Sequence, residues 1–493
     1  MNALERECAL SIAHLFMLNR FPGPLRTNSL TDAPVSGRIY ALPFEWEIRL
    51  TSILAFLSSV SGNPRHVTAV CIKEHHQEQL DVLLAINKGK PDDGESILRE
   101  VQNGFAKLFK ILSQNNAEPI DNEDRIFDTV ISMCHKRILR RLKLRGVKPG
   151  KPSIKGTLEH GRQAIQEAGE TSEFSVLVEK FEKIESLVDA WLIADEAHKS
   201  DKAPLKLLKL KEIVVALHGL QQRPGLTSMM GKIPPTANFA STLNASLLDI
   251  IEKVAMYRAC IPYLRQLETG VFLLTKRSLF GRMRIVLAKL PTEAFDRTPA
   301  DHLEANLASK IPEDIPGSER AEFFEMMCKR LRNKEGKPTK DPNGDQVKIA
   351  KDTLTKGKVH AEIQLLFHCY ELGQMELPPR VVSSSKDACY LCDAFISLHG
   401  KMYVPASHGT IYYEWRLPKV GNDDLHSRFV EHLDGLIRES RKHSLFPAES
   451  HIATGFDLVW HDDVAGGRRT LKKTMPSSGD DALRCLDVAR TAL

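Results

Sequence analysis

The chain has 493 residues and a formal net charge of +5, with 42% hydrophobic and 27% charged residues, as in ordinary soluble globular proteins. This length suits two or three domains, and the mildly basic balance permits an anionic substrate without requiring one. Nine cysteines without a dense pattern argue against a disulfide framework, and no apolar run approaches the ~18 residues of a membrane span.

The first helical pattern covers residues 1–20 and contains an apolar stretch from Ala9 to Leu18. Glu5 and Glu7 precede that stretch, whereas a signal peptide needs a basic start and a transit peptide avoids acids. We therefore expect an intracellular protein, cytoplasmic or nuclear.

Residues 1–270 are predicted to form a mostly helical region whose role the sequence does not reveal. Apolar residues recur with helical spacing in successive segments. These segments are residues 1–20, 45–60, 67–87, 95–112, 124–144, 174–198, 204–220 and 243–267, the last interrupted near Pro262.

A basic run without any acidic residue extends from Lys136 to Lys155. Such a run suits a phosphate backbone. Apolar residues interleave with its charges, so the solvated face of a packed helix is the simpler interpretation.

Beyond residue 270 the predicted elements alternate between strands and helices. Strands are expected at 284–287, 346–350, 380–382, 402–404 and 410–413, and helices at 320–331, after residue 360 and at 424–443. This order indicates α/β layering, a mixed sheet with flanking helices. We predict an α/β domain over 271–420, preceded by the helical region 1–270 and followed by a helical or flexible extension over 421–493.

Two short motifs in this second part carry the chemistry, His360-Ala361-Glu362 and Cys389-Tyr390-Leu391-Cys392. Zinc favours imidazole nitrogen and thiolate sulfur, and a catalytic zinc takes three protein ligands. His360, Cys389 and Cys392 make such a set and predict Zn²⁺ as the cofactor. Glu362 is then free to move protons at the site.

The spacing of these residues sets geometric conditions. Cys389 and Cys392, three residues apart, share a face at the start of a helix, where the N-terminus favours thiolates. His360 and Glu362 are only two apart, so they converge only if His360 lies where a helix begins.

The two motifs resemble the H-x-E…P-C-x-x-C signature of the zinc nucleobase deaminases of the cytidine-deaminase superfamily. Together with Leu398-His399-Gly400-Lys401 and Trp415-Arg416-Leu417-Pro418, they are similar to a poorly characterised fungal branch of predicted nucleic-acid or nucleotide deaminases. The superfamily's proline before the first cysteine is Ala388 here.

This resemblance implies a hydrolytic deaminase whose substrate contains a nucleobase, as a free nucleotide or in a nucleic acid. Glu362 is the implied catalytic residue. Gln364, one turn below His360, and His408, on a loop after the cysteine helix, are candidate residues of the substrate pocket.

Two alternatives stay open. The protein is a non-catalytic binding or scaffold protein if its zinc is structural. Cys389 as a covalent nucleophile with His360 as its base is the enzymatic alternative, although it leaves Cys392 and Glu362 without roles.

Overall fold

The computed structural model describes residues 2–23, 40–75, 79–114, 119–146, 152–169, 172–200, 202–310, 315–373, 375–421 and 423–445. By their contacts these residues form two compact units. The sheet unit contains residues 2–56, 65–98 and 284–445, and the helical unit contains residues 57–64 and 99–283. The predicted domains 1–270, 271–420 and 421–493 stay a prediction. By contacts, the sheet unit also takes in most of the residues before 99.

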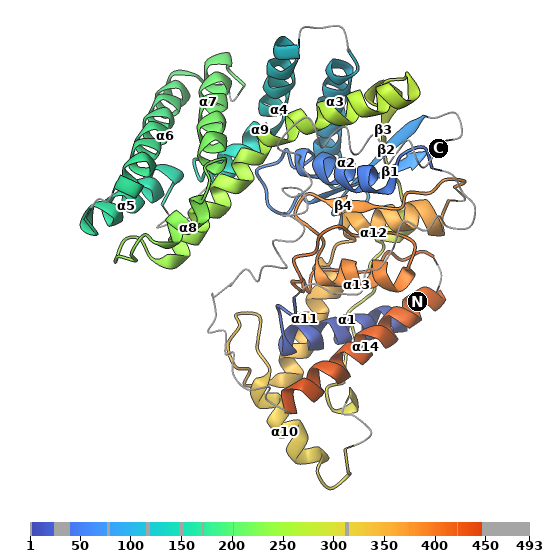
Figure 1. The fold of residues 1–493 in the computed structure, drawn as a ribbon. Helices are drawn as coiled ribbons and strands as arrows, with labels where there is room; N and C mark the ends of the chain where they lie inside the picture. The colour runs from blue at the N-terminus through green and yellow to red at the C-terminus, as the bar shows by residue number, and fades with distance from the viewer. Residues whose placement is uncertain are drawn as a thin grey trace. The chain divides into compact units, whose positions relative to one another are not determined.

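The sheet unit is built on four strands, coloured blue to orange in Figure 1 and ordered β3-β2-β1-β4. Strand β1 is antiparallel to both of its neighbours, pairing Ala69 with Ala85 on β2 and Cys71 with Val382 on β4. Isolated parallel bridges join Val381 to Tyr403 and Lys358 to Trp415. The strands are β1 (Thr68–Glu74), β2 (Leu80–Ile86), β3 (Met283–Leu287) and β4 (Val382–Ser384).

The predicted helix over residues 67–87 is wrong, because that segment forms β1 and β2. Every residue of β2 is buried, as are all but one of β1. A strand buried on both faces is an almost continuous apolar run, which periodicity alone does not separate from a buried helix.

Helices cover this sheet and pack against one another. Helix α12 contacts β1, β2 and β4, while α1 packs against both α11 and α14 (Figure 1). The helices are α1 (Asn2–Leu18), α2 (Phe44–Leu57), α10 (Arg320–Arg330), α11 (Pro342–Lys356), α12 (Ala361–Leu366), α13 (Tyr390–His399) and α14 (Asp423–Leu445). A π-helical turn, η4 (Phe367–Glu371), continues α12, and short 3₁₀ turns lie at η1 (Phe280–Arg282), η2 (Thr292–Phe295) and η3 (Ala308–Lys310).

The predicted strand over 346–350 is also wrong, because it lies inside α11. Asp341 caps this helix by accepting a hydrogen bond from the Gly344 N–H, and Pro342 occupies its first turn. Both are strong helix-start signals that outweigh a short apolar pattern.

The helical unit consists of packed helices in which α7 contacts α6 and α9. Helix α9 continues through Pro262, so the predicted interruption there is wrong. The helices are α3 (Glu95–Leu112), whose first turn belongs to the sheet unit, α4 (Pro119–Arg141), α5 (Ile154–Glu167), α6 (Ser172–Ala197), α7 (Pro204–Gln221), α8 (Leu226–Gly231) and α9 (Ser241–Thr275).

Described residues of the basic run have partners within the helical unit. Lys136 pairs with Glu100 at 3.2 Å and Arg145 with Asp195 at 2.6 Å. The interleaved side chains Ile138, Leu139 and Leu142 are buried. These contacts favour the packed-helix interpretation over a phosphate-binding one.

Among the residues described, no helix is long and apolar enough to cross a membrane. The part of the predicted C-terminal extension beyond residue 445 lies outside the described residues.

Candidate metal centre

His360 lies where α12 begins, as the two-residue spacing to Glu362 requires. Its backbone is extended, with φ −70° and ψ 152°, and α12 starts at the next residue. Two hydrogen bonds between Val359 and Lys88 keep the chain extended up to this point. The Ala361 N–H then donates to Asn87 Oδ1 at 2.8 Å, which satisfies a free donor in the first turn. The geometric prediction for His360 is therefore confirmed.

The two cysteines occupy the first turn of α13. Cys389 is the N-terminal cap, and its sulfur accepts a hydrogen bond from the Cys392 N–H at 3.5 Å. Cys389 is 2% exposed and Cys392 is fully buried. The N-termini of α12 and α13 therefore both supply ligands to one point, where their dipoles favour anionic sulfur.

The three side chains meet at distances that suit one metal ion. His360 Nδ1 is 3.5 Å from Cys389 Sγ and 3.4 Å from Cys392 Sγ. All three ligand atoms lie within 4.8 Å of one another. Zinc–nitrogen and zinc–sulfur bonds in a tetrahedral shell place N and S about 3.5 Å apart. This cluster can therefore hold a metal ion of zinc's size and preference.

The members of the cluster shift the pKa values of one another. Burial alone raises the pKa of Cys389, but the hydrogen bond from Cys392 and the His360 charge hold it well below its ordinary value. Burial lowers the pKa of His360, yet the neighbouring Cys389 charge raises it above its ordinary value. The lowered pKa of Cys389 favours the thiolate form that binds a metal ion, and metal binding would release protons from the cluster.

Glu362 lies beside this set without being one of its three ligands. Its side chain is 2% exposed, and its Oε2 atom is 3.7 Å from Cys392 Sγ. Burial raises the pKa of Glu362 above its ordinary value, while the His360 charge opposes that rise. A carboxyl group in this position can accept and return a proton at the site.

The two predicted pocket residues, Gln364 and His408, have different surroundings in the structure. Gln364 donates both amide hydrogens to main-chain carbonyls, to Ile86 O at 2.6 Å and Val359 O at 2.8 Å. It therefore joins α12 to β2, and its contact with a substrate stays a prediction.

His408 borders the cluster through Tyr412. The His408 and Tyr412 rings meet edge to face at 5.5 Å, and Tyr412 lies 6.5 Å from the His360 ring. Tyr412 is 44% exposed, so the pair forms an aromatic rim beside His360. The contact of His408 with a substrate also stays a prediction.

Two residues that support the centre were not identified from the sequence. Asn87 binds the start of α12 from the end of β2, a segment predicted to be helical. The Trp415 indole N–H donates to Cys392 Sγ at 3.3 Å. The Asn that follows an apolar run was a usable turn signal for Asn87. No local pattern indicates the contact of Trp415.

Comparison with known families agrees with this geometry. Residues 359–419, which include both motifs and Trp415, match a family model described as "OTT_1508_deam:-like deaminase". This segment is deaminase-like. This match covers a small part of the chain. The searches of curated proteins and of solved structures found no match to the chain.

Proposed function

We propose that the protein is a zinc-dependent hydrolytic deaminase that acts on a nucleobase, in a nucleotide or in a nucleic acid. The deaminase-like match over 359–419 supports the reaction class. The observation that carries the proposal is a three-ligand cluster with a fourth, acidic residue left beside it. That residue, Glu362, approaches the sulfur of Cys392 at 3.7 Å.

His360, Cys389 and Cys392 would hold the ion through one nitrogen and two sulfurs. Zinc bound by such a set supplies a Lewis acid that makes water a nucleophile at neutral pH. Three protein ligands leave room for water, whereas structural zinc sites are usually closed by four. The donor set therefore favours the enzyme over the scaffold alternative.

Glu362 would carry the protons of the reaction. It takes one proton from the attacking water and passes it to the ring nitrogen next to the amino-bearing carbon. The water oxygen bonds to that carbon, and its second proton, moved by Glu362, goes to the amino group. The C–N bond then breaks, ammonia leaves and a carbonyl remains.

The aromatic rim supports a planar substrate. Tyr412 presents a partly exposed ring close to His360, and His408 packs on its edge. Aromatic side chains stack readily on nucleobases whatever their identity. This rim favours a base as the reacting group without choosing cytosine or adenine.

The test is ammonia release by the zinc-loaded full chain. The substrates are cytidine, adenosine and guanosine, their nucleotides, and single-stranded RNA and DNA. We expect release from at least one class, and release about 10²–10⁴-fold slower from Glu362→Gln with its zinc content unchanged. Failure of the zinc-loaded wild type on every substrate would leave the scaffold alternative.

A further inference from the structure

The indole of Trp415 is bonded to one sulfur of the candidate metal centre. Its Nε1–H donates to Cys392 Sγ at 3.3 Å, and both residues are fully buried. A buried indole N–H needs an acceptor, and here the acceptor is sulfur. The contact therefore satisfies the indole donor and ties Trp415 directly to the Cys392 sulfur.

The main chain around Trp415 is bonded to the segment that presents His360. The Lys358 N–H donates to Glu414 O at 2.9 Å, and the Arg416 N–H donates to Lys358 O at 3.0 Å. Residues 414–416 therefore run beside the chain just before His360, while the Trp415 side chain reaches Cys392. One short segment connects ligands from two different helices.

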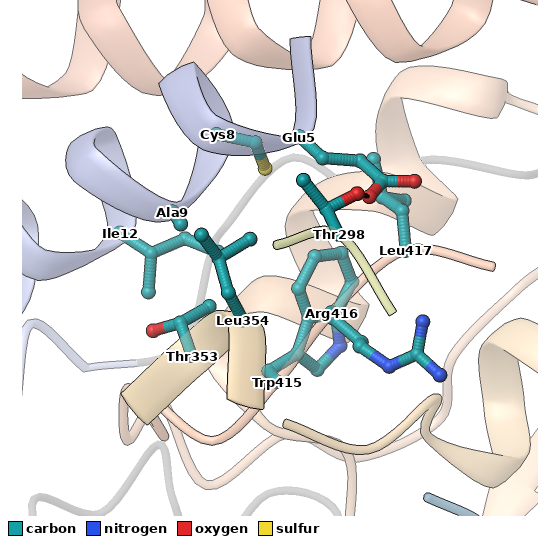
Figure 2. Close-up of a pocket in the computed structure, with 10 residues that line it drawn as sticks. All are labelled: Glu5, Cys8, Ala9, Ile12, Thr298, Thr353, Leu354, Trp415, Arg416 and Leu417. Atoms are coloured by element: carbon teal, nitrogen blue, oxygen red, sulfur yellow. Dashed lines mark hydrogen bonds between the residues drawn. The ribbon is translucent and has the colours of Figure 1, made fainter. Parts of the chain in front are cut away.

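The Trp415 ring is oriented by aromatic neighbours on part of its surface. It lies 5.4 Å from the Phe429 ring on α14 and 6.4 Å from Phe395 on α13. Elsewhere it borders a cavity that is also lined by Ile12 of α1 and Leu354 of α11, as Figure 2 shows. Because this side is not filled, the hydrogen bond to Cys392 contributes to fixing the ring.

We propose that Trp415 is a positioning residue of the metal centre. Its N–H fixes the Cys392 sulfur and draws negative charge from it, while its backbone holds the His360 segment at the matching distance. The proposal rests on the metal binding assumed in the proposed function. Removing a hydrogen-bond partner of a metal ligand typically weakens metal binding or activity about 10–100-fold.

The test uses Co²⁺ as a spectroscopic probe in the full chain. Trp415→Phe keeps an aromatic ring and removes the N–H, so the sulfur becomes richer in electrons. We expect the sulfur-to-cobalt charge-transfer band to move to lower energy. We also expect the metal dissociation constant, measured against a chromophoric chelator, to rise about 10–100-fold.

Two further variants separate the hydrogen bond from packing. Phe429→Leu loosens the same ring but keeps the N–H, so its band should stay at the wild-type position. If Trp415→Phe does not fold, benzothienylalanine at position 415 preserves the ring shape without the N–H and should give the same shift.

Three results would overturn the proposal. The first is a charge-transfer band and a metal dissociation constant equal to those of the wild type in the variant that lacks the N–H. The second is a shift of the charge-transfer band in Phe429→Leu as large as that in Trp415→Phe. Absence of Co²⁺ binding by the wild type would overturn this inference together with the zinc assignment, whereas either of the first two leaves the proposed function intact.

Discussion

The candidate metal centre and the basic run of the helical unit both gather ionisable side chains, but they place them in opposite settings. Arg145 and Lys136 are each more than 40% exposed and reach an acidic partner on a neighbouring helix. His360, Cys389, Cys392 and Glu362 are all at least nine-tenths buried and converge on one point. Ionisable groups that are buried together are typical of functional sites, because burial shifts their pKa values. Paired charges at the surface contribute little to stability and mainly keep a helix soluble.

Removing a metal ligand is the change for which we expect the largest effect, because it acts on the buried centre and not on the surface ion pairs. Cys392→Ala takes one of two sulfurs from the set, so we expect near-complete loss of bound zinc and of any deaminase activity. Metal content by elemental analysis checks this. Cys260→Ala, which removes a buried thiol of the helical unit, is the matched control and should keep the metal. Full zinc occupancy in Cys392→Ala would exclude Cys392 as a ligand.

The second prediction concerns the carboxyl group beside the ligands. Glu362→Gln keeps the size and burial of the side chain but removes its proton transfer, so turnover should fall by about 10²–10⁴-fold with zinc retained. Glu268→Gln, at a carboxylate of the helical unit that is 3% exposed, should leave turnover unchanged. Unchanged turnover in Glu362→Gln would remove Glu362 from the mechanism.

The third prediction concerns His426, a buried ionisable residue outside the metal centre. We expect its burial to affect the stability of the fold and not the metal centre. His426 on α14 is 1% exposed and lies 5.8 Å from the Phe367 ring. Burial lowers the pKa of His426 to about 4, partly opposed by the nearby Asp423 and Glu371 charges. The unfolded chain therefore binds a proton below about pH 6.5 that the folded chain binds only near pH 4.

The stability that His426 contributes is consequently complete above about pH 6.5 and is lost as the pH falls toward 4. The loss amounts to about 3 kcal/mol of unfolding free energy. Urea unfolding of wild type and His426→Leu across this range measures it, and the variant should lose less stability on acidification. His198→Leu, at an exposed helical-unit position, should behave as wild type. Parallel pH profiles for wild type and His426→Leu would contradict the prediction.

The smallest effect is expected in the basic run. Lys136→Ala breaks an ion pair whose side chains are 44% and 23% exposed, so the unfolding free energy should fall by less than about 1 kcal/mol. Zinc content and turnover should not change, as thermal melts, metal analysis and the ammonia assay would show. A large loss of nucleic-acid binding in this variant would instead restore the phosphate-binding interpretation.

Local spacing was enough to predict where His360, Cys389 and Cys392 lie relative to their helices. The two-residue step from His360 to Glu362 required a helix start, and the three-residue step between the cysteines required a first turn. Both conditions depend only on the local backbone, so they can be inferred from the sequence.

What the sequence did not predict depends on distant partners. Asn87 supports α12 from 274 residues away in the chain, and Trp415 reaches Cys392 across 23 residues. Strands β1 and β2 were missed because burial on both faces removes the alternation by which a strand is usually identified. Helix α9 passes through Pro262 because packing on α4, α5 and α7 outweighs the local cost of a proline.

The helical unit is contributed by two stretches of the chain, residues 57–64 and residues 99–283. The longer stretch interrupts the sequence between β2 and β3, which are hydrogen-bonded neighbours in the sheet. The shorter stretch runs from the last residue of α2 toward β1, so among the described residues the chain passes between the two units at four points. A short linker joining residue 98 to residue 284 would remove the longer stretch and keep residues 57–64, so the candidate centre could be studied without most of the helical unit.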